Sequence, residues 1–250
     1  MAINIKYLAN TAFLIKNAKH SMLIDSFYQI YDLPYSDIPE DVYKEILEKK
    51  GDFSDIDIVL VTHYHQDHCT KARLSEYENR NAVLILPQDT SGGSEDDVFE
   101  KHIAVPENGG RLMEDESIAI TAIPTRHDGD DKIGDTVHFS YFAEFITEGI
   151  NILFLGDADT DDETMDAVSG AVNGKKIDCL VLNFVKINQE KGRRFIKAID
   201  AKMTLLCHLP LPEDDRYHMA KLAKRNLARL GPEFDTCVMC DESGMSFEID

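Results

Sequence analysis

Apolar residues fall into short, regularly spaced runs along most of this chain. Near the start, Ile3–Leu8, Ala12–Ile15 and Ser21–Ile24 are each of strand length, and short polar turns separate them. Such a pattern is typical of hairpin strands. The next segment, Asp41–Lys49, has its apolar residues at helical spacing. We therefore expect a small antiparallel sheet followed by a helix.

Strands and helices then alternate to the end of the chain. The apolar runs predict further strands at Ile56–Val61, Ala82–Leu86, Ser117–Ile123, Thr136–Phe145, Asn151–Leu155, Ile177–Leu182, Met203–Leu206 and Cys237–Met239. Helical spacing predicts helices at Lys71–Tyr77, Gln189–Ile199 and Arg216–Leu230. Gly92–Asp97 is typical of a loop, and Asp241–Gly244 of the turn in a closing hairpin. Without a repeat or linker, this order predicts an α/β fold in a single domain, residues 1–250. Its two similar halves would each be a sheet covered by helices on one face.

Composition narrows the class of protein. The chain has 250 residues, of which 43% are hydrophobic and 29% charged, as expected for one large core or two modest ones. No apolar run is long enough to cross a membrane, and the N-terminal residues do not read as a signal peptide. Five cysteines, an odd number, indicate reduced thiols and hence a cytoplasmic protein.

The net charge of −20 argues against a nucleic-acid partner. Proteins hold polyanions with clustered Lys and Arg, because these contacts release counterions. Dense basic runs occur only at Lys191–Arg194 and Lys221–Arg225, both within predicted helices, where they would form solvated faces. We therefore expect a small-molecule partner, no nucleic acid and no membrane.

One polar segment directly after a predicted strand is rich in potential metal ligands. Residues 62–68 read Thr-His-Tyr-His-Gln-Asp-His, an H-x-H-x-D-H pattern. Side chains two apart on an extended chain point the same way, so His63 and His65 leave the strand side by side. A turn would then bring Asp67 and His68 back over the same point. Imidazole with carboxylate suits Zn²⁺, and a mixed set open to solvent predicts a catalytic ion.

Further potential ligands follow other predicted strands. His127, Asp157 and His208 each come within a few residues of a strand end. Loops at strand ends carry function on a rigid scaffold. We therefore expect these three side chains to converge with the histidine cluster.

Together these motifs resemble the metallo-β-lactamase superfamily. The order H-x-H-x-D-H, then His, then Gly-Asp, then a late His is similar to that family's ligand set, and residues 5–15 and 22–26 resemble its first hairpin. The resemblance implies an αββα four-layer sandwich with the metal site in the cleft between the sheet edges. It also implies a pair of divalent ions, most often Zn²⁺, with Mn²⁺ or Fe²⁺ as alternatives. The implied ligands are His63, His65 and His127 for one ion, Asp67, His68 and His208 for the other, and Asp157 as a bridge.

The ligand spacing and His208-Leu209-Pro210 resemble the lactonase and phosphodiesterase-like branch, which includes the ascorbate-6-phosphate lactonase type. Metal ions that share a hydroxide lower its pKa and polarise a carbonyl or phosphoryl oxygen, while Asp67 would orient the water and move its proton. This predicts a dinuclear zinc-dependent hydrolase of small esters, lactones or phosphodiesters. Thr62 and Asp57 are candidate hydrogen-bond partners of the imidazoles. Asn10 and Ser26 depart from the family pattern.

Other functions fit the same residues. One alternative is a nuclease of the RNA-processing type, against which the acidic charge and the lack of room for a nucleic-acid-binding domain weigh. The other is a non-catalytic metal-binding sensor or partner module, although lost activity usually removes ligands. His65 stands where flavodiiron relatives have Glu, which argues against that branch.

The remaining histidines and cysteines receive structural roles. His138, inside a predicted strand, is expected to pack or to lie at the surface, with a substrate contact as the alternative. Surface positions are expected for His20, His102 and His218. Cys237 and Cys240 lack the second cysteine pair of a zinc ribbon and are predicted as buried thiols. Cys69 and Cys207 adjoin ligands and are expected to pack against the site.

Acidic residues follow several candidate ligands: Asp128, Asp130 and Asp131; Asp159, Asp161 and Asp162; Glu213, Asp214 and Asp215. Around one cleft mouth they would repel polyanions and favour neutral or cationic substrates; the alternative is solvated loop charges. The run from Asp157 lacks the Gly and Glu of a calcium loop, so we reject that interpretation. Tyr28–Lys50 is predicted to place a helix on the sheet, with a lid or homo-oligomer contact as the alternative.

Overall fold

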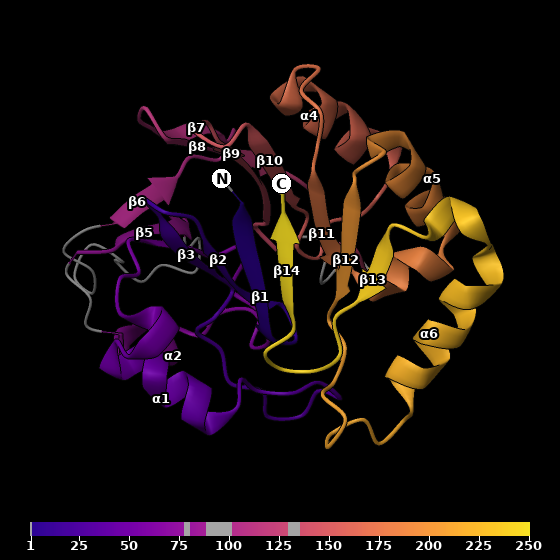
Figure 1. The fold of residues 1–250 in the computed structure, drawn as a ribbon, viewed down its shortest axis with the longest axis horizontal. Coiled ribbons are helices and arrows are strands. Elements are labelled where there is room, and N and C mark those ends of the chain that lie inside the picture. Colours follow the sequence, from indigo (N-terminus) through magenta and orange to yellow (C-terminus); the bar gives the residue numbers. More distant parts are fainter. Residues whose placement is uncertain (1, 78–80, 89–101, 130–135) are drawn as a thin grey trace.

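A computed structural model describes residues 2–77, 81–88, 102–129 and 136–250. Its strands form two sheets at the centre of the molecule, with helices on either side (Figure 1). The helices outside the first sheet are α1 (Glu40–Glu48) and α2 (Lys71–Ser75). Those outside the second sheet are α4 (Asp162–Val172), α5 (Glu190–Ile199) and α6 (Met219–Leu230). Short 3₁₀ helices cover Gly51–Phe53, Phe184–Asn188 and Pro232–Phe234. This arrangement is the predicted αββα sandwich.

The first sheet contains seven strands among the described residues. Their spatial order is β14 (Ser246–Ile249), β1 (Ile3–Ala9), β2 (Ala12–Lys16), β3 (Ser21–Ile24), β4 (Ile58–Leu60), β5 (Val83–Pro87) and β6 (His102–Val105). The pairs from β14 to β3 are antiparallel, whereas those from β3 to β6 are parallel. The parallel strands β3 and β4 therefore end at the same edge of the sheet.

The second sheet repeats this plan. Its spatial order is β13 (Cys237–Met239), β12 (Met203–Cys207), β11 (Cys179–Asn183), β10 (Ile150–Phe154), β9 (Phe139–Phe145), β8 (Ile118–Pro124) and β7 (Gly110–Glu114). The pairs from β13 to β10 are parallel, and those from β10 to β7 are antiparallel. The predicted hairpin between β9 and β10 is confirmed, with Phe145 opposite Ile150.

Alternating side chains in the second sheet create two cores. Ile152 and Phe154 of β10 join the core shared with the first sheet, while Leu153 joins the core beneath α4 and α5. Successive residues on a strand point to opposite faces, so a strand covered on both sides is apolar at nearly every position. This explains why the inner strands read as continuous apolar runs in the sequence.

The closing hairpin predicted at Asp241–Gly244 is wrong. β13 lies at the edge of the second sheet, whereas β14 crosses to the first sheet and pairs antiparallel with β1. The crossing is fixed by a hydrogen bond from Gly244 N to Tyr7 O, at 2.9 Å. The last strand thus covers an otherwise open sheet edge and buries Ile249.

The predicted loop Gly92–Asp97 lies outside the described residues. Among the helices that are described, none is long and apolar enough to cross a membrane.

Candidate metal centre

The predicted ligands converge from four strand ends. His63 to His68 follow β4, His127 follows β8, Asp157 follows β10 and His208 follows β12. Within each of three groups, the nitrogen and oxygen atoms that could bind a metal lie within 4.8 Å of one another. The groups are His63, His65 and His127 (the first triad); Asp67, His68 and His208 (the second triad); and His63, His68 and Asp157.

The first triad presents three ring nitrogens to one point. His63 Nε2 lies 3.1 Å from His65 Nδ1, and His127 Nε2 is buried without a hydrogen-bond partner. In two of these histidines, the ring nitrogen that points away from the other ligands makes a hydrogen bond. His65 Nε2 bonds Thr136 Oγ1 at 3.1 Å, and His127 Nδ1 bonds the Asp128 carbonyl at 2.7 Å. Such bonds fix the tautomer that leaves the inward nitrogen free for a metal.

The second triad meets the first at Asp157. His208 Nε2 lies 3.2 Å from Asp67 Oδ2 and also 3.2 Å from Asp157 Oδ2. The same Asp157 oxygen is 3.4 Å from His68 Nε2 and 3.7 Å from His127 Nε2. One carboxylate oxygen therefore faces ligands of both triads, which is the position that a bridging ligand requires.

The two triads differ in their electrostatics. Burial lowers the pKa of His63, His65 and His127, so these rings stay neutral with lone pairs available. In the second triad, burial opposes the charge of His208 but the neighbouring Asp157 carboxylate raises its pKa well above the usual value. Burial likewise acts against ionisation of Asp157, yet His208 and His68 hold the pKa of Asp157 well below its usual range.

Asp25 supports the second triad and was missed in the sequence. Its Oδ2 accepts hydrogen bonds from His68 Nδ1 at 2.9 Å and from Thr62 Oγ1 at 2.7 Å. Thr62 Oγ1 also lies 3.0 Å from His63 Nδ1, which confirms the predicted role of that residue. A carboxylate behind a ligating imidazole fixes its tautomer and raises its basicity. The sequence signal was an acidic residue directly after a buried strand, Ser21–Ile24.

The other predicted support, Asp57, does not contact the site. It precedes β4, at the opposite strand end from His63, and it bonds His20 Nδ1 at 2.7 Å and Ser21 N at 2.8 Å. His20 Nε2 bonds Ser117 Oγ at 2.7 Å, so this histidine joins the two sheets and is not the surface residue that we expected.

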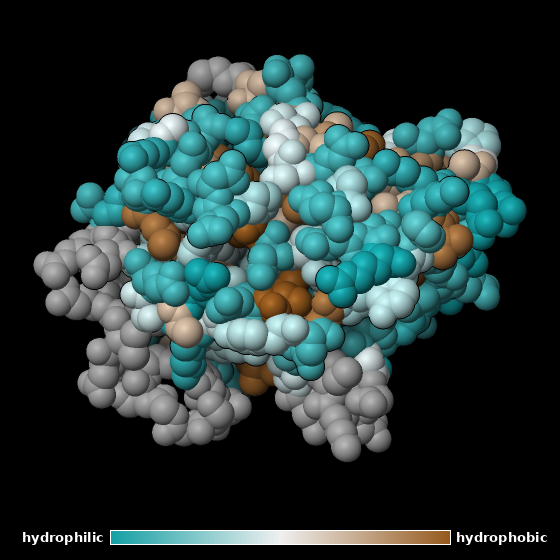
Figure 2. Space-filling view, turned by 90° about the horizontal axis from the view of Figure 1, so that it is seen from below, coloured by the Kyte–Doolittle hydropathy of each residue, from teal (hydrophilic) through white to brown (hydrophobic). Residues whose placement is uncertain are grey.

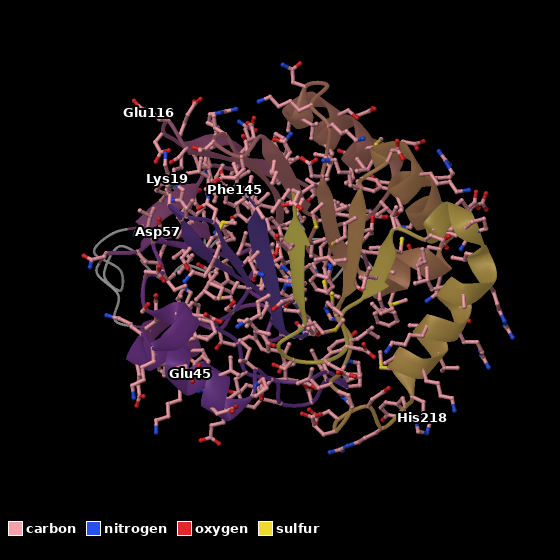
Figure 3. The ribbon with its side chains drawn as sticks, in the orientation of Figure 1. Lys19, Glu45, Asp57, Glu116, Phe145 and His218 are labelled. Atoms are coloured by element: carbon pink, nitrogen blue, oxygen red, sulfur yellow. The ribbon has the colours of Figure 1, made fainter. Side chains whose placement is uncertain are left out.

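The three histidines that we expected at the surface differ in their exposure and contacts. His218 is exposed and lies at the outer edge of the molecule near the start of α6, as predicted (Figure 3). His102 is half-buried in β6. His20 has the linking role described above.

Asn10, a departure from the family pattern, ties two ligand loops together. Its Nδ2 donates to the Asp67 carbonyl at 2.8 Å, and its own carbonyl accepts from His208 N at 2.6 Å. Both Asn10 and His208 have positive φ angles, 48° and 69°. Such angles are uncommon outside glycine and gather at functional sites. The departure therefore has a structural reason.

His138 is fully inside the molecule and touches the ligand shell. Its Nε2 accepts a hydrogen bond from Asp157 N at 3.1 Å, and its Nδ1 bonds Thr125 Oγ1 at 2.8 Å. Gly156, at φ +59°, leaves room for this ring, because a Cβ there would lie 2.8 Å from His138 Nε2. The packed position that we predicted is confirmed, and it also holds the backbone of Asp157.

All five cysteines lie in the described part of the chain, where they are buried and form no disulfide. The prediction of buried thiols at Cys237 and Cys240 is therefore confirmed. Cys207 Sγ bonds the Leu182 carbonyl at 3.5 Å and faces the protein interior.

Most of the acidic residues near the ligand loops are paired. Asp128 bonds the buried Lys186, and Asp159 bonds Lys191 as well as Arg126, the latter at 3.1 Å. These pairs reduce the negative potential that we expected from the acidic residues on this side of the centre.

Other members of the acidic clusters start helices or lie outside the described residues. Asp161 Oδ1 accepts from Thr164 N at 2.9 Å and caps α4, which explains the run that resembled a calcium loop. Asp215 accepts from Met219 N at 2.6 Å and Ala220 N at 3.1 Å, in the first turn of α6. Asp130 and Asp131 fall outside the described residues.

The insertion Tyr28–Lys50 places the predicted helix against the first sheet and also reaches the ligand loops. The buried Tyr43 and Ile46 of α1 join the core beside the first sheet. Upstream of the helix, the Tyr35 ring meets the His208 ring edge to face, with centroids 4.2 Å apart. This segment therefore borders the metal centre.

Comparison with known families agrees with this geometry. Residues 4–208 match the family model of the β-lactamase superfamily domain, which covers all the predicted ligands. The chain belongs to the metallo-β-lactamase superfamily. A comparison with curated proteins gave no match.

Solved structures with low sequence identity share the fold of this superfamily member. One is a possible metal-dependent hydrolase from Veillonella parvula, with TM-score 0.70, 12% identity, and 99% of both chains covered. Another is Igni18, a metallo hydrolase from Ignicoccus hospitalis, with TM-score 0.64, 15% identity, and 100% of this chain and 99% of that one covered. A third is CmlA, a diiron β-hydroxylase from Streptomyces venezuelae, with TM-score 0.61 and 14% identity. In that comparison 98% of this chain spans 53% of CmlA.

Proposed function

We propose that this protein is a cytoplasmic, dinuclear metal-dependent hydrolase, with zinc as the native metal. The observation that carries the proposal is a set of three buried ring nitrogens, the Nε2 atoms of His68, His127 and His208, which face Asp157 Oδ2 at 3.2 to 3.7 Å without making a well-aligned hydrogen bond. Three such nitrogens around one carboxylate oxygen form a donor set that suits a cation. The described donors are imidazole and carboxylate, the set that suits zinc.

Each triad would hold one ion, with Asp157 shared between them. Bound there, the ions would supply a water of lowered pKa as the nucleophile and would polarise the oxygen of the scissile group. The chain's own residues do the positioning. Asn183 Nδ2 donates to Asp157 Oδ1 at 2.9 Å, which leaves Oδ2 aimed at the ligands.

Asp67 is the proposed proton carrier. Its carboxylate faces the shared centre through Oδ2, while Asn10 and Thr11 bond its backbone carbonyl at 2.8 and 3.1 Å. These bonds fix the backbone from which the Asp67 carboxylate projects, and a carboxylate at this position could orient a water molecule and later move its proton to the leaving group. The substrate would be a small ester, lactone or phosphodiester, in line with the resemblance to the lactonase branch.

The fold also serves other chemistry, because CmlA, a diiron β-hydroxylase, shares it. His65 provides a second nitrogen in the first triad, which favours zinc over an oxygen-activating iron pair. A nuclease activity is disfavoured by the net charge of −20.

A hydrolase screen on the zinc-loaded protein tests the proposal. Lactones, esters, thioesters, phosphodiesters and amides would be offered to the wild type and to Asp67→Asn. Turnover by the wild type and a large loss in kcat for Asp67→Asn is the expected result, and the metal content of both proteins is measured alongside, because Asp67 is also a candidate ligand of the second triad. No turnover of any class by fully loaded protein would contradict hydrolysis.

A further inference from the structure

A cavity of about 650 Å³ lies beside the metal centre. It is partly open to solvent and is lined by side chains between Tyr28 and Leu47, by Leu211, Glu213 and Asp214, and by Arg73 and Glu76. Figure 2 views the end of the molecule where α1 and these loops lie, and shows a small apolar area framed by hydrophilic residues. A volume of this size is in the range of small-molecule pockets, about 300–1,000 Å³.

Tyr35 connects the cavity to the metal centre. It lines the cavity, and its ring contacts the His208 ring at 4.2 Å. Leu211, three residues beyond His208, forms another part of the wall, and its backbone N–H bonds Ser36 Oγ at 2.8 Å. A substrate whose reacting group lies at the second triad would therefore have this cavity next to it.

The wall of the cavity is also fixed to the ligand loop of the H-x-H-x-D-H motif. Gln66 accepts a hydrogen bond from Tyr31 N at 3.2 Å and donates to Asp32 Oδ1 at 2.7 Å. Tyr28, in the same wall, donates through its hydroxyl to the Ser36 carbonyl at 3.2 Å. Several bonds therefore hold the segment in one place relative to the metal ligands, as a specificity pocket requires.

The lining combines aromatic rings with an excess of acid. The rings are Tyr28, Tyr31, Tyr35 and Tyr43. The acidic groups are Asp37, Glu40, Glu76, Glu213 and Asp214, against the basic Lys44 and Arg73. Arg73 is already engaged, since it lies 3.4 Å from Glu76 and stacks on the Tyr43 ring at 4.6 Å. Tyrosine faces and carboxylates together attract organic cations and repel anions.

We propose that this cavity receives the non-reacting part of the substrate, and that this part is an aliphatic or aromatic group that is uncharged or carries an ammonium. A carboxylate or phosphate at that end of the substrate is rejected. This inference rests on the proposed hydrolytic function, and it names the substrate class for that site.

A matched ester series tests the preference. The p-nitrophenyl esters of 6-aminohexanoic acid, heptanoic acid and pimelic acid share one leaving group and one chain length but end in an ammonium, a methyl and a carboxylate. The expected kcat/KM is highest for the first two and lower by about tenfold or more for the carboxylate, the scale of discrimination that one pocket contact provides.

Two leucine substitutions locate the effect. Leu33 lines the cavity and is 37% exposed, and Leu222 on α6 lies outside it and is 43% exposed. Leu33→Trp should narrow the cavity and remove most of the preference among the esters, whereas Leu222→Trp should keep the wild-type values. Thermal unfolding of both variants checks that each is folded.

Binding of 4-phenylbutylamine and 4-phenylbutyrate to the metal-loaded protein, measured by calorimetry, separates the two hypotheses. Amine binding that Leu33→Trp abolishes, without hydrolysis of any ester, would keep the cavity assignment and reject the hydrolase. Hydrolysis with equal kcat/KM for all three esters, or with an unchanged preference in Leu33→Trp, would overturn the cavity assignment alone. Neither hydrolysis nor amine binding would overturn both.

Discussion

Replacing Asp25 by asparagine should weaken metal binding at the second triad. In the wild type the buried Asp25 carboxylate accepts from His68 Nδ1 at 2.9 Å, so in the metal-bound protein the His68 proton would stay on Nδ1 and Nε2 would be available to the metal. Asparagine has the same shape but only one acceptor oxygen. In the wild type, Asp25 Oδ1 accepts a hydrogen bond from Thr62 N at 2.8 Å. If the asparagine oxygen keeps this bond, the amide N–H group faces His68. His68 then has to accept on Nδ1, which favours the tautomer with the His68 proton on Nε2.

The size of the effect follows from one charge-assisted hydrogen bond. Such a bond is worth about 1.5–3 kcal/mol, and about 1.4 kcal/mol corresponds to tenfold in affinity. We therefore expect the affinity for the ion at the second triad to fall roughly 10- to 100-fold. This is the range typical of mutating a residue that hydrogen-bonds to a metal ligand. Asp25 has φ 44°, a conformation that asparagine also tolerates, so the substitution adds little backbone strain.

Asp57→Asn is the matched control. Asp57 lies on the same sheet and bonds a histidine, His20, but that histidine is not a candidate ligand. The assay is competition for Zn²⁺ with a chromophoric chelator, which gives affinity and stoichiometry, together with thermal unfolding of each metal-free variant. We expect Asp57→Asn to change the unfolding temperature but not the affinity.

Two results would refute this reasoning. Unchanged affinity of both ions in Asp25→Asn would mean that the His68 tautomer does not depend on Asp25. An equal loss of affinity in Asp57→Asn would mean that the effect is a general loss of stability.

Further predictions concern the shared carboxylate, one glycine and the substrate. Asp157→Asn should lower metal content and activity more than His138→Ala or Cys207→Ser, because an amide cannot neutralise a pair of cations; equal, small losses in all three would contradict a bridge. Gly156→Ala should lower the unfolding temperature more than Gly174→Ala, since both have positive φ but only the first Cβ would collide, 2.8 Å from His138 Nε2. Small neutral or singly charged esters should be turned over with negligible cleavage of RNA, and efficient RNA cleavage at moderate salt would overturn this.

Most of the sheet strands were predictable because their side chains are buried on both faces. Ser21–Ile24 and Cys237–Met239 match the predicted bounds, since an aspartate, Asp25 or Asp241, follows the apolar run of each within two residues. β7 was missed because its residues Gly110–Glu114 are largely exposed at a sheet edge. α4 was missed because its acidic start, Asp161 to Glu163, read as part of a loop, although Asp161 is the helix cap.

The candidate ligands were easier to predict than the residues that hydrogen-bond to them. His63 and His65 are two apart in one segment, so periodicity alone places them side by side. Asp25 and His138 reach the centre from other strands, and their roles depend on sheet order, which local patterns do not encode. Asp57 was a wrong choice for the same reason. It is close to His63 in sequence, but the whole of β4 lies between the two residues.

The central claim is that the converged side chains hold a pair of metal ions, and elemental analysis of protein purified without chelators tests it most directly. The expected result is close to two transition-metal ions per chain, mainly zinc, falling clearly in Asp157→Asn but not in Cys207→Ser. Protein that contains no metal, or only Mg²⁺, would contradict the assignment of these residues as ligands.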